Sequence, residues 1–310
     1  MEDTARPRRP VAPDTVRRAT TAALDQVRSR NATAAVTPDR EFQFTDADFE
    51  KIRALIYDHA GISLAPIKRD MVYSRLARRL RACGDRTFAD YLRRLEHDSA
   101  EWETFTNSLT TNLTSFFREE HHFDILTERL KQVRERRTIK IWCSAASTGE
   151  EPYSIAIAAC EGFNSLTPPV EIIASDIDTN VLAQARAGVF RADRIERMSE
   201  SRKQRFFLRG KGTQEGFVRV RPELQKLIEF KRINLLDASY PLQGPFDYLF
   251  CRNVMIYFDK DTQRKILTRF VPLLRKDGVM FAGHSESFLH CADLFRSRGR
   301  TVYERSDANQ

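Results

Sequence analysis

The segment IWCSAASTGEEPYSIAI, residues 141–157, places small residues, one glycine and two adjacent acids between a β-type run and an apolar helical run. Gly149 in such a strand-to-helix turn lets a ligand approach the backbone closely. The segment is not the GxGxxG fingerprint, and Glu150 and Glu151 would repel a phosphate at the helix N-terminus. The spacing therefore favours a cationic or zwitterionic ligand, and it fits equally an ordinary turn whose acids complement the helix dipole.

Two further acids follow the second β-rich run, where ASDID places Asp176 and Asp178. An acid at the end of the second strand is where doubly wound folds bind ribose hydroxyls. We expect Asp178 or Thr179 to cap the next helix, which leaves Asp176 for the ligand. Together the two acidic loops indicate a nucleoside ligand without a pyrophosphate, and S-adenosylmethionine meets that description.

A third cluster, TTNLTSFFREEHHF, residues 110–123, mixes polar groups with aromatics and is typical of a ligand-facing segment between domains. It includes His121 and His122, but adjacent histidines are expected to face different directions on a helix, and no HExxH spacing follows. We therefore expect no metal site.

The segment FCRNVMIYF, residues 250–258, follows a strongly apolar run. Arg252, Asn253 and Tyr257 should emerge there at the same sheet edge as the first two loops. A single arginine or tyrosine is more often a surface or packing residue, yet three polar groups after a buried strand fit the ligand crevice of open α/β sheets.

The elements that position these residues are short β-rich runs alternating with amphipathic helices after about residue 115. This alternation predicts an α/β domain with a parallel sheet covered by helices on both faces. Candidate strands lie at residues 138–145, 170–177, 227–234, 246–253, 278–284 and 300–305. Residues 205–220 instead indicate a β-hairpin around a glycine-rich turn.

The first part of the chain has a different texture. Residues 1–40 lack periodicity and are expected to form a flexible tail. Thr45 followed by Asp48 predicts a helix cap, and further helices are expected at 71–83, 87–97 and 100–109. The expected organisation is a tail (1–40), an all-α domain (41–115) and an α/β domain (116–310) with a β-subdomain insert at about 200–222.

Composition narrows the functional class of this 310-residue chain. Its apolar runs are too short to span a bilayer and its N-terminus lacks a signal-like apolar core, so a cytoplasmic protein is expected. The five cysteines are widely spaced without a CxxC pair, which favours reduced packing residues over a disulfide or zinc site. The net charge of +8 suits nucleic acid or an acidic protein equally, although the basic residues crowd between positions 68 and 94.

Several blocks taken together closely resemble the CheR-type chemotaxis receptor methyltransferases over about residues 44–305. The blocks are TTNLTSFFRE, WCSAASTGEEPYSIAI, ASDIDTNVLAQARAGVF, RINLLD, FCRNVMIYFD and GVMFAGHSES. The resemblance implies a small all-α domain before a Rossmann-like, doubly wound S-adenosylmethionine-dependent methyltransferase domain with an inserted β-subdomain.

The resemblance also implies roles for residues at matching motif positions. The cofactor-binding set would be Asn112, Thr114, Arg118, Glu151, Asp176, Asn234, Leu235, Arg252 and Asn253. Tyr257 is similar to a residue beside the transferred methyl group, so Tyr257 and Arg118 are the expected catalytic residues. The implied reaction converts receptor glutamates to γ-glutamyl methyl esters and releases S-adenosylhomocysteine. A glutamate is already ionised at neutral pH, so no general base is expected.

Two surfaces are expected to dock the receptor, whose cytoplasmic domains would be the partner in membrane arrays. In MVYSRLARRLRAC, Val72, Leu76 and Leu80 share one face of the helix, and a group of arginines lies largely on its other faces. That group is Arg75, Arg78, Arg79 and Arg81. The loop RGKGTQEG, with Gly210, Gly212 and Gly216, resembles that of family members tethered to a C-terminal receptor pentapeptide. The alternative for the arginines is a solvated basic helix face without a partner, and the alternative for the glycine loop is a plain hairpin turn.

Two alternatives are a nucleic-acid methyltransferase and a non-catalytic S-adenosylmethionine-binding chemotaxis regulator. The first shares the fold and basic charge, but CRNVMIYF stands where base methylases often carry an NPPY-type motif. We therefore expect neither nucleic-acid binding nor direct membrane insertion. The sequence leaves open which receptors and glutamates are modified, the role of residues 1–40 and the oligomeric state.

Overall fold

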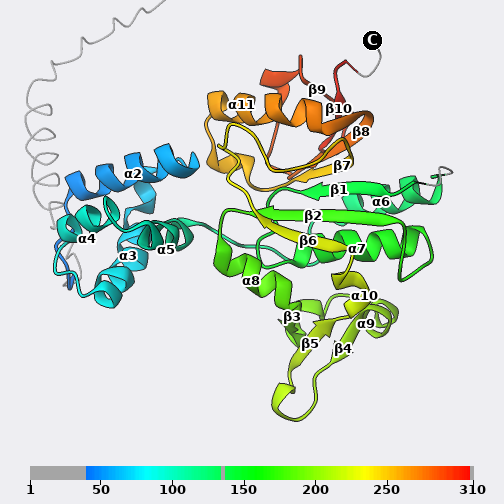
Figure 1. The fold of residues 1–310 in the computed structure, drawn as a ribbon, viewed down its shortest axis with the longest axis horizontal. Coiled ribbons are helices and arrows are strands. Elements are labelled where there is room, and N and C mark those ends of the chain that lie inside the picture. The colour runs from blue at the N-terminus through cyan, green and yellow to red at the C-terminus, as the bar shows by residue number, and fades with distance from the viewer. Residues whose placement is uncertain (1–39, 134–136, 308–310) are drawn as a thin grey trace, which may run out of the picture. The chain divides into compact units, whose positions relative to one another are not determined.

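The computed structural model describes residues 40–133 and 137–307 (Figure 1). The tail predicted for residues 1–40 therefore lies almost wholly outside the described residues. The chain divides into two compact units after Glu41, and the unit described below begins at Phe42. No helix in the two described ranges has both the length and the apolar character needed to cross a bilayer. The domain boundaries expected from the sequence stay predictions.

The first part of this unit is helical. Its elements are α2 (Asp46–Ala60), η1 (Pro66–Lys68), α3 (Arg69–Cys83), α4 (Phe88–Leu95) and α5 (Ser99–Leu109). The predicted cap is confirmed: Asp48 N donates to the Thr45 hydroxyl over 3.1 Å, and Thr45 N donates to the Asp48 carboxylate over 2.9 Å. Val72, Leu76 and Leu80 are fully buried, so the predicted apolar face of α3 is also confirmed.

The second part contains a mostly parallel seven-stranded sheet within the described residues, in the order β6-β2-β1-β7-β8-β10-β9. The strands are β1 (Ile139–Cys143), β2 (Val170–Asp176), β6 (Ile228–Arg232), β7 (Phe246–Cys251), β8 (Leu274–Ala282), β9 (Phe295–Ser297) and β10 (Val302–Arg305). The six strands predicted from the sequence are confirmed. β9 was not predicted, because three residues are too few to show periodicity.

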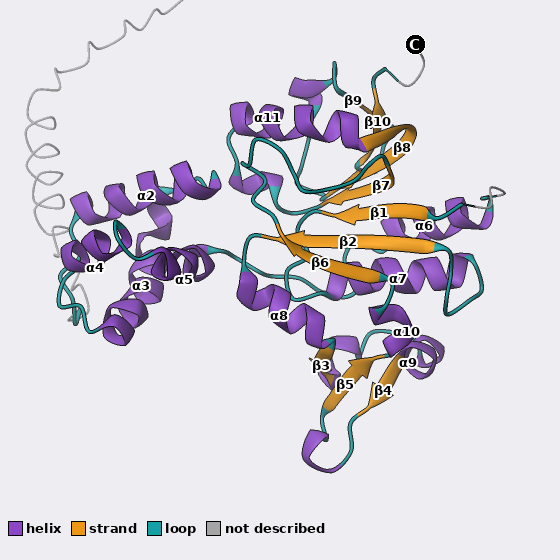
Figure 2. Cartoon of the chain, in the orientation of Figure 1, coloured by secondary structure: helices purple, strands orange, loops and turns teal. Residues whose placement is uncertain are grey.

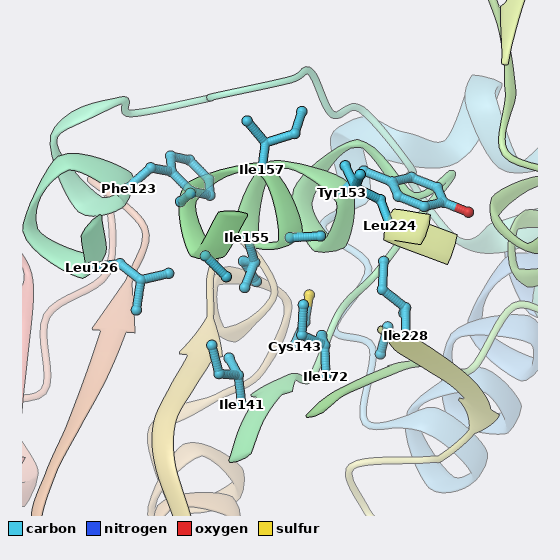
Figure 3. Packing of buried hydrophobic residues seen from close by; sticks show 14 of the residues in the cluster. Phe123, Leu126, Ile141, Cys143, Tyr153, Ile155, Ile157, Ile172, Leu224 and Ile228 are labelled. Carbon is cyan, nitrogen blue, oxygen red and sulfur yellow. The ribbon is translucent and has the colours of Figure 1, made fainter. Parts of the chain in front are cut away.

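Helices cover both faces of this sheet (Figure 2). They are α6 (His121–Lys131), α7 (Glu150–Gly162), α8 (Thr179–Ala187) and α11 (Lys260–Phe270), with short turns η4 (Met255–Tyr257), η5 (Val271–Leu273) and η6 (Leu289–Cys291). Alternate β1 residues enter different cores: Ile141 and Cys143 pack with α6 and α7, whereas Trp142 packs with α11. Figure 3 shows Ile155 of α7 pointing toward β1, the strand that carries Ile141 and Cys143. The predicted doubly wound fold is confirmed.

A smaller antiparallel sheet is inserted between β2 and β6, in the order β3-β5-β4. Its elements are β3 (Val189–Arg191), η2 (Ala192–Ile195), α9 (Glu200–Phe206), β4 (Phe207–Arg209), η3 (Gly212–Gln214), β5 (Phe217–Val220) and α10 (Pro222–Gln225). The predicted hairpin is present as β4 and β5. The third strand was missed because β3 is only three residues long and pairs with a distant segment.

Asp178 fixes the connection between α5 and the edge of the large sheet. One carboxylate oxygen caps α8 by accepting from Asn180 N over 2.9 Å. The other oxygen accepts from the Thr110 hydroxyl and the Asn112 side-chain amide, each over 2.8 Å. The predicted capping role of Asp178 is thus confirmed, and the same carboxylate anchors the segment that enters the site.

We expect Asp178→Ala to lower the free energy of unfolding by about 3 kcal/mol, because it removes a helix cap and leaves buried donors unpaired. Denaturant titration measures this change. A suitable control is Asp193→Ala, which removes an exposed 3.2 Å ion pair with Arg191 and should change stability by less than about 1 kcal/mol. Equal effects of the two variants would contradict an anchoring role.

Candidate active site

A cavity of about 370 Å³ lies at the carboxyl ends of the parallel strands, within the size range of small-molecule and cofactor sites. The nine predicted cofactor-binding residues and Tyr257 all line it. The helical part adds residues 60, 62–65, 68 and 71 to the lining. The structure therefore brings the predicted site residues together, while their individual roles stay predictions.

Asp176 occupies the end of β2 and faces the cavity. Its carboxylate accepts from Ser147 N over 2.8 Å and from Asp178 N over 3.0 Å. Burial raises the pKa of Asp176 to about 6, against the opposing effect of these backbone donors. Burial thus destabilises the ionised Asp176 carboxylate, and this hydrogen-bond acceptor is held where a ligand hydroxyl could donate to it.

Gly149 has a different role from the one expected. Its φ is +103°, and an added Cβ would lie 3.0 Å from the Ala185 Cβ. The glycine therefore permits close packing of the turn against α8. Ser144, Ala145 and Ser147, rather than Gly149, line the cavity in this loop.

The two acids that follow Gly149 are separated by their partners. Glu150 is paired with Arg194, whereas Glu151 lines the cavity and is joined to Arg252 over 2.7 Å. Burial raises the pKa of Glu151, and the nearby guanidinium opposes that rise. Only Glu151 is therefore placed to meet a ligand.

Arg252 is fully buried as a side chain and lies between two carboxylates. Besides Glu151, its guanidinium lies 3.3 Å from a Glu119 oxygen and donates to the Arg118 carbonyl. The Phe123 ring centroid lies 5.3 Å from the guanidinium carbon. The cavity lining therefore combines the carboxylates of Glu151 and Asp176 with the cations of Lys68, Arg118 and Arg252, and groups of both signs suit a zwitterionic ligand.

The segment 112–118 is held by its own polar groups. The Asn112 amide is engaged by Asp178, and its carbonyl accepts from the Ser147 hydroxyl over 3.0 Å. Arg118 Nη1 donates to the Leu113 carbonyl over 3.0 Å. Part of the predicted cofactor set therefore also shapes the cavity.

Backbone atoms of the helical part hold two further cavity loops. The Asn234 amide donates to the His59 carbonyl over 2.7 Å, beside buried Leu235. Ser63 N donates to the Tyr257 carbonyl over 2.9 Å. These contacts could not be predicted from the sequence, because any residue type can supply a backbone carbonyl or N–H.

Glu286, which the sequence analysis did not single out, organises the loop after β7. Its Oε1 accepts from Val254 N over 2.9 Å and from Met255 N over 2.7 Å. Its Oε2 accepts from Asn253 N over 2.9 Å and from Gly283 N. Burial raises the pKa of Glu286, while these four donors oppose the rise. The carboxylate of Glu286, within GHSES, therefore binds the backbone of CRNV and fixes the loop that carries Tyr257.

Asn253 completes this arrangement with a φ of +57°. Its amide donates to Glu119 over 3.3 Å, so Glu119 contacts both Asn253 and Arg252. Glu119 was also missed, since only the fold brings residues 119 and 252 together.

The expectation that His121 and His122 face different directions is wrong. Both Nε2 atoms approach the Arg300 carbonyl, at 3.2 and 3.0 Å, and the ring centroids are 4.1 Å apart. Both residues lie in the first turn of α6, where the loop containing Arg300 approaches them. Burial lowers the pKa of His122 to about 4. In the described part of the chain, no group of three His, Cys, Asp or Glu is arranged to hold a metal ion.

The four arginines of α3 are in two different situations. Arg75 Nη1 donates to the Thr110 carbonyl over 2.6 Å, and Arg79 pairs with Glu101 over 2.7 Å. Burial tends to raise the pKa of Glu101, but hydrogen bonds from Arg79 and Tyr91 keep it lowered. Arg78 and Arg81 are exposed. Arg75 and Arg79 are half-buried and brace α5, whereas Arg78 and Arg81 lie at the surface.

The glycine-rich loop connects β4 to β5. Gly212 and Gly216 have φ values of +58° and +83°, and an added Cβ at Gly210 would meet the Gln214 carbonyl oxygen. The three glycines thus form the loop itself. A groove of about 620 Å³ lies beside β4, lined by residues of η2, α9 and β4 with Val218.

A doubly wound sheet whose second strand ends in an acid facing a cavity at the carboxyl edge defines the class of S-adenosylmethionine-binding methyltransferases. Within that class, the chain belongs to the CheR methyltransferase family. The family's all-alpha domain matches residues 47–110, and its SAM binding domain matches residues 112–303.

Relatives agree with this family. The chain is 52% identical over 266 residues to chemotaxis protein methyltransferase 2 of Pseudomonas aeruginosa, covering 86% of this chain and 95% of that protein. It is 54% identical over 264 residues to the chemotaxis protein methyltransferase of Salmonella typhimurium, covering 84% and 91%. The corresponding protein of Escherichia coli is 52% identical over 264 residues, covering 84% and 92%.

We expect Glu286→Gln to reduce methyltransferase turnover about tenfold, since an amide NH₂ would face backbone donors and displace the Asn253–Tyr257 loop. Steady-state kinetics with a thermal melt measures the effect. Glu229→Gln is the control, because Glu229 is exposed and its side chain forms a surface ion pair with Lys231 over 3.2 Å. Normal turnover in Glu286→Gln would show that the loop holds its position without this charge.

Proposed function

We propose that this protein transfers a methyl group from S-adenosylmethionine to glutamate side chains of chemoreceptor cytoplasmic domains, forming γ-glutamyl methyl esters. The observation that carries the proposal is the cavity in which Asp176, Glu151 and Arg252 meet Arg118 and Tyr257, with Glu119 paired to Arg252. The names of the relatives, each a chemotaxis protein methyltransferase, support the receptor as substrate.

The cavity residues fit this donor. Asp176 would accept hydrogen bonds from the ribose hydroxyls, and Glu151 would pair with the amino group. Glu119 Oε2 and Arg252 Nε are buried without a hydrogen-bond partner in the described structure, so this polar cluster has capacity left for a ligand or water. When bound, S-adenosylmethionine supplies a methyl group already activated by its sulfonium.

The chain's own contribution to the reaction is alignment. A glutamate acceptor is ionised at neutral pH, so no side chain must remove a proton. Tight ion pairing to the acceptor would favour the ground state, because charge is lost on the way to the transition state. Arg118 and Tyr257 therefore orient the acceptor and exclude water, effects worth roughly 7–11 kcal/mol when the geometry is good.

Receptor docking is proposed at two surfaces. Exposed Arg78 and Arg81 on α3 would steer a glutamate-rich receptor helix. β4 is an edge strand beside the groove lined by α9, so a receptor C-terminal peptide could add to it as a further strand. Both contacts would recruit the enzyme to receptor arrays at the membrane. Calorimetry with such a pentapeptide tests the second surface directly.

The test of the function is incubation with methyl-labelled S-adenosylmethionine and receptor-containing membranes, followed by base. A glutamyl ester releases volatile labelled methanol, whereas methylated lysine or nucleic acid keeps the label. No release of S-adenosylhomocysteine, despite donor binding, would identify a non-catalytic regulator instead.

We expect the affinity for S-adenosylhomocysteine to fall as pH drops below about 6. A ribose hydroxyl needs the Asp176 carboxylate as acceptor, and the pKa of that group is raised to about 6. Protonation therefore favours the free protein, and the Kd should rise about tenfold per pH unit below 6. Calorimetry from pH 5 to 8 measures this.

Asp176→Asn is the matched variant for this titration, with weaker but less pH-dependent binding expected. A pH dependence of Kd that survives in Asp176→Asn would assign it to another carboxyl, such as Glu151.

We expect Tyr257→Phe and Arg118→Ala each to slow methyl transfer about tenfold or more while the pH profile keeps its shape. Single-turnover rates across neutral pH measure both. A bell-shaped profile in the unmodified protein that disappears in one variant would reveal a general base and contradict the alignment mechanism.

We expect Arg78→Glu with Arg81→Glu to raise the KM for receptor several-fold at low salt and little at high salt. The control reverses two exposed charges elsewhere, Lys276→Glu with Arg296→Glu. Arg75 is unsuitable for this test because its side chain also holds the Thr110 carbonyl. A KM unchanged at low salt would rule out docking through α3.

A further inference from the structure

Two of the exposed large apolar side chains lie on the rim of the active-site cavity. The exposed ones in the described ranges are Tyr57, Ile67, Leu113, Val189, Leu208, Phe217, Ile256 and Leu289. Leu113 is 79% exposed, Ile256 is 49% exposed, and both line the cavity. Ile67, 88% exposed, directly precedes Lys68, another lining residue. Grouped exposure of this kind is typical of an interaction surface.

The backbone beneath these side chains is fixed. The Leu113 carbonyl accepts from Arg118 over 3.0 Å. Ile256 lies between Met255, whose N–H donates to Glu286 over 2.7 Å, and Tyr257, whose carbonyl accepts from Ser63. Leu113 and Ile256 are therefore held toward water by ordered segments, and covering them would recover hydrophobic free energy.

The charge around the rim indicates what covers it. Lys68 is exposed and lines the cavity with Leu113 and Ile256. The inner wall carries the carboxylates of Asp176 and Glu151, where the ribose hydroxyls and the amino group of the donor would lie. An occupant of the rim thus meets apolar surface and a cation, and has access to Arg118 and Tyr257. A protein segment with a carboxylate between apolar side chains meets all of these requirements.

We propose that Leu113 and Ile256, together called the apolar rim, pack against apolar side chains that flank the acceptor glutamate on the receptor. This inference rests on the proposed function and names the part of the site that selects the acceptor. The apolar rim acts at the reacting end, whereas Arg78 and Arg81 act on α3. Selection between glutamates of one receptor would depend on their apolar neighbours.

The test uses the full chain and a soluble chemoreceptor cytoplasmic fragment as substrate, which removes any contribution from lipid. Leu113→Ser and Ile256→Ser are each expected to raise the KM for the fragment about tenfold, with most of the loss in kcat/KM coming from KM. The Kd for S-adenosylhomocysteine should stay within about twofold. Leu113→Met, which keeps an apolar side chain, should retain a KM near that of the unmodified protein.

Leu289→Ser is the matched control, because Leu289 is 80% exposed and does not line the cavity. Its KM should not change. An unchanged KM in both rim variants, or a Kd for S-adenosylhomocysteine that weakens in parallel with KM, would overturn the apolar rim as a receptor contact. If the unmodified protein forms no base-labile ester, the proposed function itself fails, which is a distinct result.

Discussion

The buried guanidinium of Arg252 is the interaction on which the cavity depends. It links the carboxyl end of β7 to Glu151 of α7 and to residues 118 and 119 before α6. Removing one partner of such a buried pair typically costs about 3–5 kcal/mol, because the remaining charge is left without compensation. Three segments distant in the sequence are thus set relative to one another by one side chain, and the cavity-lining residues Arg118 and Asn253 adjoin them.

Groups of both signs line the cavity beside this arginine, and that mixture is consistent with a zwitterionic ligand. The pKa values of Asp176 and Glu151 are raised by burial, so each carboxylate is less stable than in water. A cationic donor would relieve part of that cost. The basic character of the whole chain therefore says little about the site, because many of its arginines are paired with acids inside the fold.

Elements with continuous apolar runs or helical periodicity were predictable from the sequence. The six predicted strands were of this kind, as was the Thr45 cap, which depends on residues three apart. β3 and β9 were missed because each has only three residues, too few to show periodicity, and β3 also pairs with a strand about 30 residues away. The carboxylates at the end of β2 and at the start of α7 were predictable, because the ends of parallel strands meet at one edge of the sheet. The hydrogen bonds of Glu286 to four backbone N–H groups were not, because backbone donors leave no pattern in the sequence. The sequence also does not show which arginines of α3 are engaged inside the fold. Arg75 and Arg79 are, because the Thr110 carbonyl and Glu101, distant in the sequence, lie beside them.

The contacts of the helical part with the cavity loops have a consequence for evolution. His59 contributes its carbonyl and Ser63 its amide N–H, and neither contact depends on the identity of those residues. Residues 59 and 63 are therefore free to change in sequence while still supplying these two groups, whereas Tyr57 and Asn107 of the same helical part bond to Asp259 and Thr179 through their side chains. Changes at residues 59 and 63 would leave these two supports of the methyl-transfer machinery in place.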